Sequence, residues 1–153
     1  MMDNKLHIVP YTSEHGNFIL SCQMNHKILE ADSKYIKVMG DAKNLEQDHL
    51  AFTGIVNHKP IFAAGYKIFW GNVAECWLIA TNEMSNYSLS VAKIIKKDFA
   101  RIAKENKLQR VQTAIRKDFK EGIKFAEWLG LEREGLMKNW GFDGSDQYMY
   151  ARI

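Results

Sequence analysis

The sequence of 153 residues has few of the features that mark linkers, membrane spans or disulfide frameworks. It has two prolines, no low-complexity tract and no repeat, so it predicts one domain over residues 1–153. No apolar run approaches the roughly 20 residues that cross a bilayer, and the first ten residues lack the apolar core of a secretion signal. Two cysteines, Cys22 and Cys76, stand far apart outside any redox motif. These absences favour a cytoplasmic protein with reduced thiols and no membrane partner.

Metal ligands are also sparse. The five histidines form no dense ligand cluster. Cys22 and His26 could share one helix face, but two ligands do not make a zinc site. The sequence therefore predicts no metal.

Charge is distributed unevenly along the chain. The stretch from Lys93 to Lys124 contains eleven Lys and Arg against four Asp and Glu, a surplus of seven, whereas the whole chain has a net charge of +3. The remaining residues are therefore net acidic. The basic stretch could attract the phosphates of a cofactor or of nucleic acid, or it could be a solvated helix face. Because no helix-turn-helix pattern or aromatic stacking platform accompanies it, the sequence argues against nucleic-acid binding.

Hydrophobic periodicity predicts strands that alternate with helices. Helical spacing predicts two or more helices between Glu14 and Leu50, one over Ser88–Asn106, and one capped by Asp118 with Glu121 in the capping-box position. Strands are expected over Lys5–Tyr11, Ala51–Val56, Ile61–Tyr66, Val73–Ala80, Leu108–Ile115, Leu131–Lys138 and Gln147–Ile153. Strands on both sides of the two later helices indicate crossovers. We therefore expect an α/β (α+β) fold with a mixed sheet of six to seven strands and about four helices.

The last third of the chain has the most distinctive order of signals. A helix ends at Trp128-Leu129-Gly130, where glycine is a left-handed stop. Leu131-Glu132-Arg133-Glu134-Gly135 follows as a strand, and the turn signal Phe142–Ser145 leads into a closing strand that contains Tyr148–Arg152.

This order resembles the GNAT superfamily of N-acetyltransferases over nearly the whole chain. More narrowly, Ala74–Ile79, Arg110-Val111-Gln112 and the tail resemble short acetyltransferase-like proteins of tailed phages, among them a small internal virion protein of podoviruses. The resemblance implies a GNAT-like sheet that is splayed between its fourth and fifth strands, with acetyl-coenzyme A (acetyl-CoA) in the opening. It also implies an amine acceptor and a homodimer, in a host cytoplasm or a virion if the chain is phage-encoded.

The resemblance also implies where the cofactor binds. Pantetheine would pair with backbone groups of Leu78, Ile79 and Ala80, and the pyrophosphate would lie at the helix start, near Ser85, Asn86, Tyr87 and Ser88. A helix N-terminus offers unpaired N–H groups and the positive end of a dipole. The family's loop is rich in glycine, however, whereas 82–90 has none and includes Glu83. The serines and Asn86 could equally be plain capping residues.

The catalytic candidates are Glu75 and Tyr148. The family often has a glutamate on the fourth strand, which makes Glu75 the expected base, and apolar neighbours could raise the pKa of its carboxyl. Its alternative role is to face solvent or pair with Lys67. The family's usual acid, a tyrosine, falls on Ala126 here, so Tyr148 is the expected substitute, with Tyr87 and Tyr150 as alternatives.

Two functions follow from these residues. The leading hypothesis is an acyl-CoA-dependent N-acyltransferase that transfers an acetyl group to an amine. The alternative is a non-catalytic GNAT-fold phage structural or assembly protein, which the glycine-free loop and the missing tyrosine favour.

Overall fold

The computed structural model describes residues 5–22, 42–47 and 49–153. Within them the helices are α1 (Ser13–Ser21), η1 (Ala42–Leu45), η2 (Asn82–Tyr87), α3 (Ser88–Glu105) and α4 (Lys120–Trp128), of which η1 and η2 are 3-10 helices. The strands are β1 (His7–Pro10), β2 (Ala51–Val56), β3 (Lys59–Trp70), β4 (Val73–Ala80), β5 (Arg110–Arg116), β6 (Glu132–Met137) and β7 (Gln147–Arg152). They form one sheet in the order β1-β2-β3-β4-β5-β7-β6. The predicted mixed sheet is confirmed, since β4 and β5 are parallel and β5–β7 and β6–β7 are antiparallel.

The chain folds into two compact units, Met1–Lys67 with Trp77–Ile102, and Ile68–Cys76 with Ala103–Ile153. The single domain predicted over 1–153 stays a prediction. The predicted helical residues between Cys22 and Ala42 lie outside the described ranges. No helix in the described ranges is long and apolar enough to cross a membrane.

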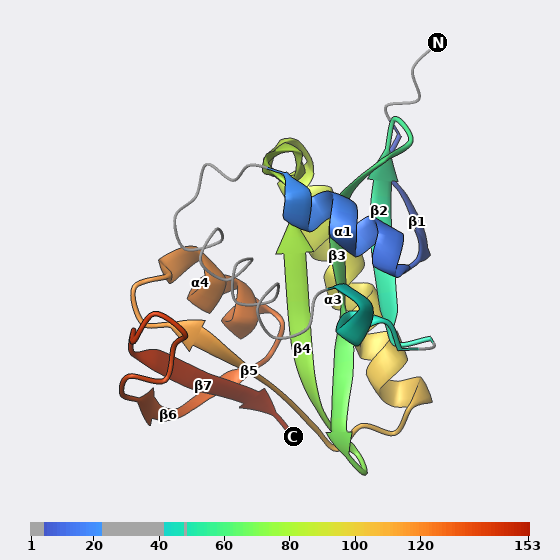
Figure 1. The fold of residues 1–153 in the computed structure, drawn as a ribbon. Coiled ribbons are helices and arrows are strands. Elements are labelled where there is room, and N and C mark those ends of the chain that lie inside the picture. The colour runs from blue at the N-terminus through green and yellow to red at the C-terminus, as the bar shows by residue number, and fades with distance from the viewer. Residues whose placement is uncertain (1–4, 23–41, 48) are drawn as a thin grey trace. The chain divides into compact units, whose positions relative to one another are not determined.

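In the first unit, α1 and α3 cover opposite faces of the strands (Figure 1). Ile19 and Leu20 of α1 pack with Ala63 of β3 and with Trp77 and Ile79 of β4. On the other face, Phe99 of α3 contacts Phe52 and Tyr66, and the Tyr66 hydroxyl donates to the Phe99 carbonyl at 3.0 Å. The alternation of the strands thus divides the apolar residues between two helices.

The start of α1 is fixed by a capping box that contains a histidine. The Thr12 hydroxyl accepts from the His15 backbone N–H at 3.3 Å, and the Thr12 N–H donates to His15 Nδ1 at 3.2 Å. Buried Thr53 of β2 lies 2.9 Å from the same Nδ1. Because Nδ1 already accepts from Thr12, the Thr53 hydroxyl must be the donor in this contact. Neutral His15 therefore holds α1 to β2, and its burial lowers the pKa of the imidazole against an opposing effect of Glu14.

In the second unit, the buried apolar residues come from β4, β5 and β7, from the end of α3, from α4 and from the turn after α4. They are Ala74, Cys76, Ala103, Val111, Ala126, Leu129, Leu131, Tyr150 and Ala151. Arg133 of β6 contacts two aromatic rings of β7. Its guanidinium lies 3.8 Å from the Tyr148 ring centroid, and its Nε donates to the Tyr150 hydroxyl at 3.0 Å.

The N-cap predicted for α4 is wrong, whereas the predicted C-terminal stop is confirmed. Asp118 does not cap the helix: the N-cap is Phe119, with no side-chain bond, because both Asp118 oxygens are bound by Arg116, at 3.1 and 3.3 Å. At the other end, Gly130 has φ +94°, and the N–H groups of Gly130 and Leu131 donate to the carbonyls of Glu127 and Ala126. This is the bonding of a Schellman stop.

Candidate active site

Glu75 lies where the parallel pairing of β4 with β5 ends. The registered pairs are Val73 with Arg110, Ala74 with Val111 and Glu75 with Gln112. The Glu75 side chain is half-buried. A carboxylate at this point could take a proton from an amine.

The strand registers show which face of the second unit each side chain occupies. Residues directly opposite each other on neighbouring strands share a face, and successive residues alternate. Glu75 therefore shares a face with Gln112, and Gln112 with Ala151. Tyr148 and Tyr150 are an odd number of residues from Ala151, so they occupy the other face. The two catalytic residues expected from the sequence, Glu75 and Tyr148, thus lie on opposite faces of the sheet.

Cys76 next to Glu75 is not a reactive thiol. It is buried, and its Sγ lies 3.6 Å from the Gln112 carbonyl oxygen. Burial, with a smaller effect of Glu75, raises its pKa to about 12. The thiol therefore stays protonated at neutral pH, so it is a poor nucleophile.

Gln112, the residue opposite Glu75 on β5, belongs to a series of hydrogen-bonded polar side chains. Arg110 Nε donates to Gln112 Oε1 at 2.7 Å, and its two Nη groups donate to the carboxylate of Glu134 at 2.9 and 2.5 Å. The hydrogen bond to Glu134 raises the pKa of Arg110, and that bond lowers the pKa of Glu134. Sequence reasoning gave Gln112 no role, because its position beside Glu75 depends on a register that no sequence pattern specifies.

The expected cofactor-binding residues lie in the first unit. Ile79 and Ala80 are buried, whereas Leu78 is 37% exposed. Thr81 directly follows β4. Its N–H and its hydroxyl both donate to the Ile61 carbonyl, at 2.9 and 3.2 Å. This fixes the point at which the chain leaves the strand.

The glycine-free segment after Thr81 is helical rather than an open loop. Ser85, Asn86 and Tyr87 belong to η2, and Ser88 begins α3 with helical φ and ψ. The Met84 N–H donates to the Thr81 carbonyl, and the Ser85 hydroxyl donates to the Asn82 carbonyl at 2.9 Å. Some of the polar groups expected to face a pyrophosphate are therefore used inside the turn itself.

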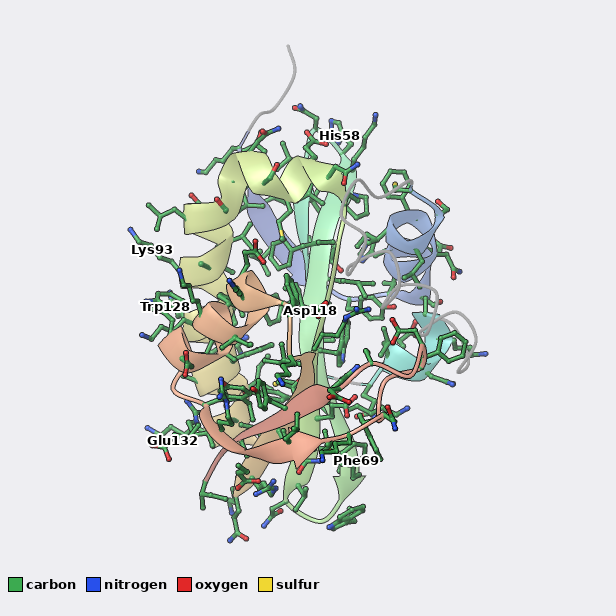
Figure 2. All side chains as sticks on the ribbon, turned by 90° about the vertical axis from the view of Figure 1, so that its left-hand side faces the viewer. His58, Phe69, Lys93, Asp118, Trp128 and Glu132 are labelled. Carbon is green, nitrogen blue, oxygen red and sulfur yellow. The ribbon has the colours of Figure 1, made fainter. Side chains whose placement is uncertain are left out.

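The basic residues of α3 are exposed. Lys93, Lys96, Lys97 and Arg101 all lie off the buried stripe of the helix, and Figure 2 shows Lys93 pointing away from the strands. Arg101 pairs with Asp98 at 3.5 Å. In the described part of the chain, no group of three or more His, Cys, Asp or Glu side chains could hold a metal ion.

The strand order and the parallel β4–β5 pair are those of the GNAT acetyltransferase fold. One similar solved structure is a GNAT-family acetyltransferase from Streptococcus pneumoniae, with a TM-score of 0.71, 12% identity, and 97% of this chain and 98% of that chain covered. An N-acetyltransferase from Staphylococcus aureus Mu50 has a TM-score of 0.69 and 17% identity, with 97% and 98% covered. The ribosomal-protein-S18-alanine N-acetyltransferase from Escherichia coli has a TM-score of 0.68 and 12% identity, with 96% and 92% covered.

These likenesses extend over nearly the full length of both chains, and at such identities they establish the fold. The sequence itself matches no protein-family model and no curated protein.

Proposed function

We propose that the chain is an acyl-CoA-dependent N-acyltransferase that transfers the acetyl group of acetyl-CoA to an amine. The observation that carries the proposal is the position of Glu75, a half-buried carboxylate at the last registered pair of parallel β4 and β5, in a chain with the GNAT fold. The phage origin expected from the sequence applies to this enzyme as well as to the alternative described below, and it stays a prediction.

The proposed reaction needs a neutral amine and a leaving thiolate. The amine nitrogen attacks the thioester carbonyl carbon, the C–N bond forms, the C–S bond breaks, and the thiolate leaves with the electron pair. The nitrogen loses a proton, which Glu75 accepts directly or through a water, and the thiolate takes up a proton. We propose that backbone groups of Leu78, Ile79 and Ala80 bind the pantetheine arm. Ser85–Ser88 would lie against the pyrophosphate.

The thiolate needs a proton donor. Tyr148 stays a prediction for this role, and its position on the face opposite Glu75 favours a packing role beneath Arg133. Buried Cys76, whose pKa is about 12, could not form an acyl-thioester at neutral pH without first being exposed. Direct transfer between the two substrates is therefore the mechanism that these residues support.

Binding of acetyl-CoA is the first test. A ligand that occupies only the folded state at about 100 times its Kd adds ~2.7 kcal/mol, which raises the Tm of a chain of this size by roughly 5 to 10 °C. We expect this shift with millimolar acetyl-CoA, measured by differential scanning calorimetry. An unchanged Tm would remove the support for the enzyme.

The role of Glu75 is tested separately. We expect Glu75→Gln to keep the acetyl-CoA shift and to lower turnover by about 10²-fold or more, the lower range for a general base. Glu132→Gln is a matched control, because Glu132 is an exposed glutamate of β6 in the same unit (Figure 2). Equal turnover of the wild type and Glu75→Gln would eliminate Glu75 as the base.

The alternative is a non-catalytic phage structural or assembly protein with this fold. It is favoured by η2, which replaces an open glycine-rich turn with a helical one between Thr81 and Ser88. Retention of the protein in purified phage particles, together with no thermal shift by acetyl-CoA, would support it over the enzyme. The homodimer and the cytoplasmic location stay predictions.

A further inference from the structure

The amide of Gln112 has a fixed orientation. Arg110 Nε is a donor, so the amide atom that faces it at 2.7 Å must be the oxygen Oε1. Arg110 is itself held by two hydrogen bonds to Glu134. The nitrogen Nε2 of Gln112 is therefore directed away from Arg110. Within the described part of the chain, it donates to no other group.

This donor lies beside the proposed base. Gln112 and Glu75 are directly opposite each other on the same face, one strand spacing or about 4.8 Å apart. Gln112 is half-buried, like Glu75. Along β4, Glu75 precedes Leu78, the first residue proposed to hold the cofactor, by three positions. The Gln112 amide is thus level with the base.

We propose that Gln112 is a substrate-binding residue that selects acceptors with a carbonyl or carboxylate oxygen next to the reacting amine. This inference rests on the proposed N-acyltransferase function. Amino acids, their amides and peptide N-termini have this arrangement, with the nitrogen and the oxygen separated by two carbon atoms. The amine nitrogen lies against Glu75 and the oxygen accepts from Gln112 Nε2.

Arg110 and Glu134 act as positioning residues in this arrangement. Without Arg110, the Gln112 amide is free to rotate and to present its oxygen instead of its nitrogen. An oxygen in that position repels a carbonyl oxygen. Selection therefore depends on Arg110 even though Arg110 does not touch the acceptor.

The test compares two amines that differ in one substituent of the carbon that bears the amine. Alaninamide has the carbonyl oxygen, and isopropylamine has a methyl group in its place. Binding is measured by NMR on the ¹⁵N-labelled full chain with saturating coenzyme A, which has no acetyl group to transfer. We expect alaninamide to shift the Gln112 side-chain amide signals and to bind roughly five- to tenfold more tightly than isopropylamine, the value of one net hydrogen bond.

Variants distinguish a direct role of the Gln112 side chain from a general effect on the fold. Gln112→Leu should abolish the preference for alaninamide, whereas Gln109→Leu, at an exposed glutamine before β5, should keep it. Arg110→Met leaves Gln112 intact and should reduce the preference, and Arg110→Lys should retain part of it. Arg110→Met provides the test if Gln112→Leu does not fold.

The outcomes distinguish this inference from the proposed function. Equal binding of the two amines, a preference that survives in Gln112→Leu, or binding of coenzyme A without either amine would overturn the role of Gln112 and leave the enzyme hypothesis standing. If coenzyme A itself does not bind, the proposed function and this inference both fail.

Discussion

Gly65 is a position of the first unit at which neighbouring backbone atoms leave no room for a side chain. It is registered opposite Ala51, and a Cβ added at Gly65 would lie 2.5 Å from the Ala51 Cβ and 2.6 Å from the Leu50 carbonyl oxygen. That oxygen cannot retreat freely, because it accepts from the Tyr66 N–H at 3.0 Å. We therefore expect Gly65→Ala to force β2 and β3 apart.

The magnitude follows from two opposing effects. Overpacking of this kind costs about 1–3 kcal/mol, and replacing glycine by alanine returns about 0.4–1 kcal/mol by restricting the unfolded chain. The difference spans about 0–2.6 kcal/mol in the free energy of unfolding, and we expect a loss near its middle, about 1.3 kcal/mol. For a chain of this size, that loss corresponds to a fall in Tm of roughly 3–5 °C.

Urea denaturation and calorimetry measure the change, with Gly135→Ala as the matched control. Gly135 also lies in a strand, but a Cβ added there would meet nothing within 4 Å. We expect Gly135→Ala to be neutral or slightly stabilising. The reasoning is refuted if Gly65→Ala is as stable as the wild type, or if both variants lose the same free energy.

Three further predictions concern titration and reactivity. Because the pKa of His15 is lowered in the folded state, the unfolded chain binds the proton first as pH falls. The stabilisation is therefore complete above the unfolded pKa of 6.5 and is lost as pH falls from there to the lowered value. His15→Gln should flatten this slope in urea titrations, and an unchanged slope would contradict the assignment. Arg116→Met should raise the pKa of Asp118 towards its ordinary 3.8, because the Arg116 hydrogen bond lowers it. Carboxyl NMR measures this pKa, and a constant value would refute the pairing. Of the two thiols, half-buried Cys22 should react with a disulfide reagent in the native protein and buried Cys76 only after unfolding. Two equally fast thiols would exclude the burial of Cys76.

The sequence predicted the elements that local patterns determine. The predicted strands over Ala51–Val56 and Val73–Ala80 have the observed bounds of β2 and β4, and the predicted helix over Ser88–Asn106 exceeds α3 by one residue. These segments have uninterrupted periodicity between clear turn signals. The stop at Gly130 was also predictable, because only glycine takes a φ of +94° readily there.

The failures concern contacts that the local sequence does not encode. Asp118 is a residue type that often caps helices, but both of its carboxylate oxygens accept from Arg116, two residues earlier. The phosphate-binding role expected of Ser85–Ser88 stays a prediction. The glycine-free residues 82–87 form η2, which leads directly into α3. The strand registers across β4, β5 and β7 determine which side chains share a face. They place Glu75 and Tyr148 on opposite faces and Glu75 beside Gln112, and no local pattern specifies them.

The insertion of β7 between β5 and β6 has a consequence for synthesis of the chain. β6 pairs with β7, and β7 pairs with β5, so the last of these three strands to be made joins two strands made before it. Until Gln147–Arg152 emerges, Glu134 on β6 has no strand that holds it near Arg110. The second unit is therefore expected to complete its fold only after Gln147–Arg152 has been made, and a chain truncated before Gln147 should lack the Arg110–Glu134 pair altogether.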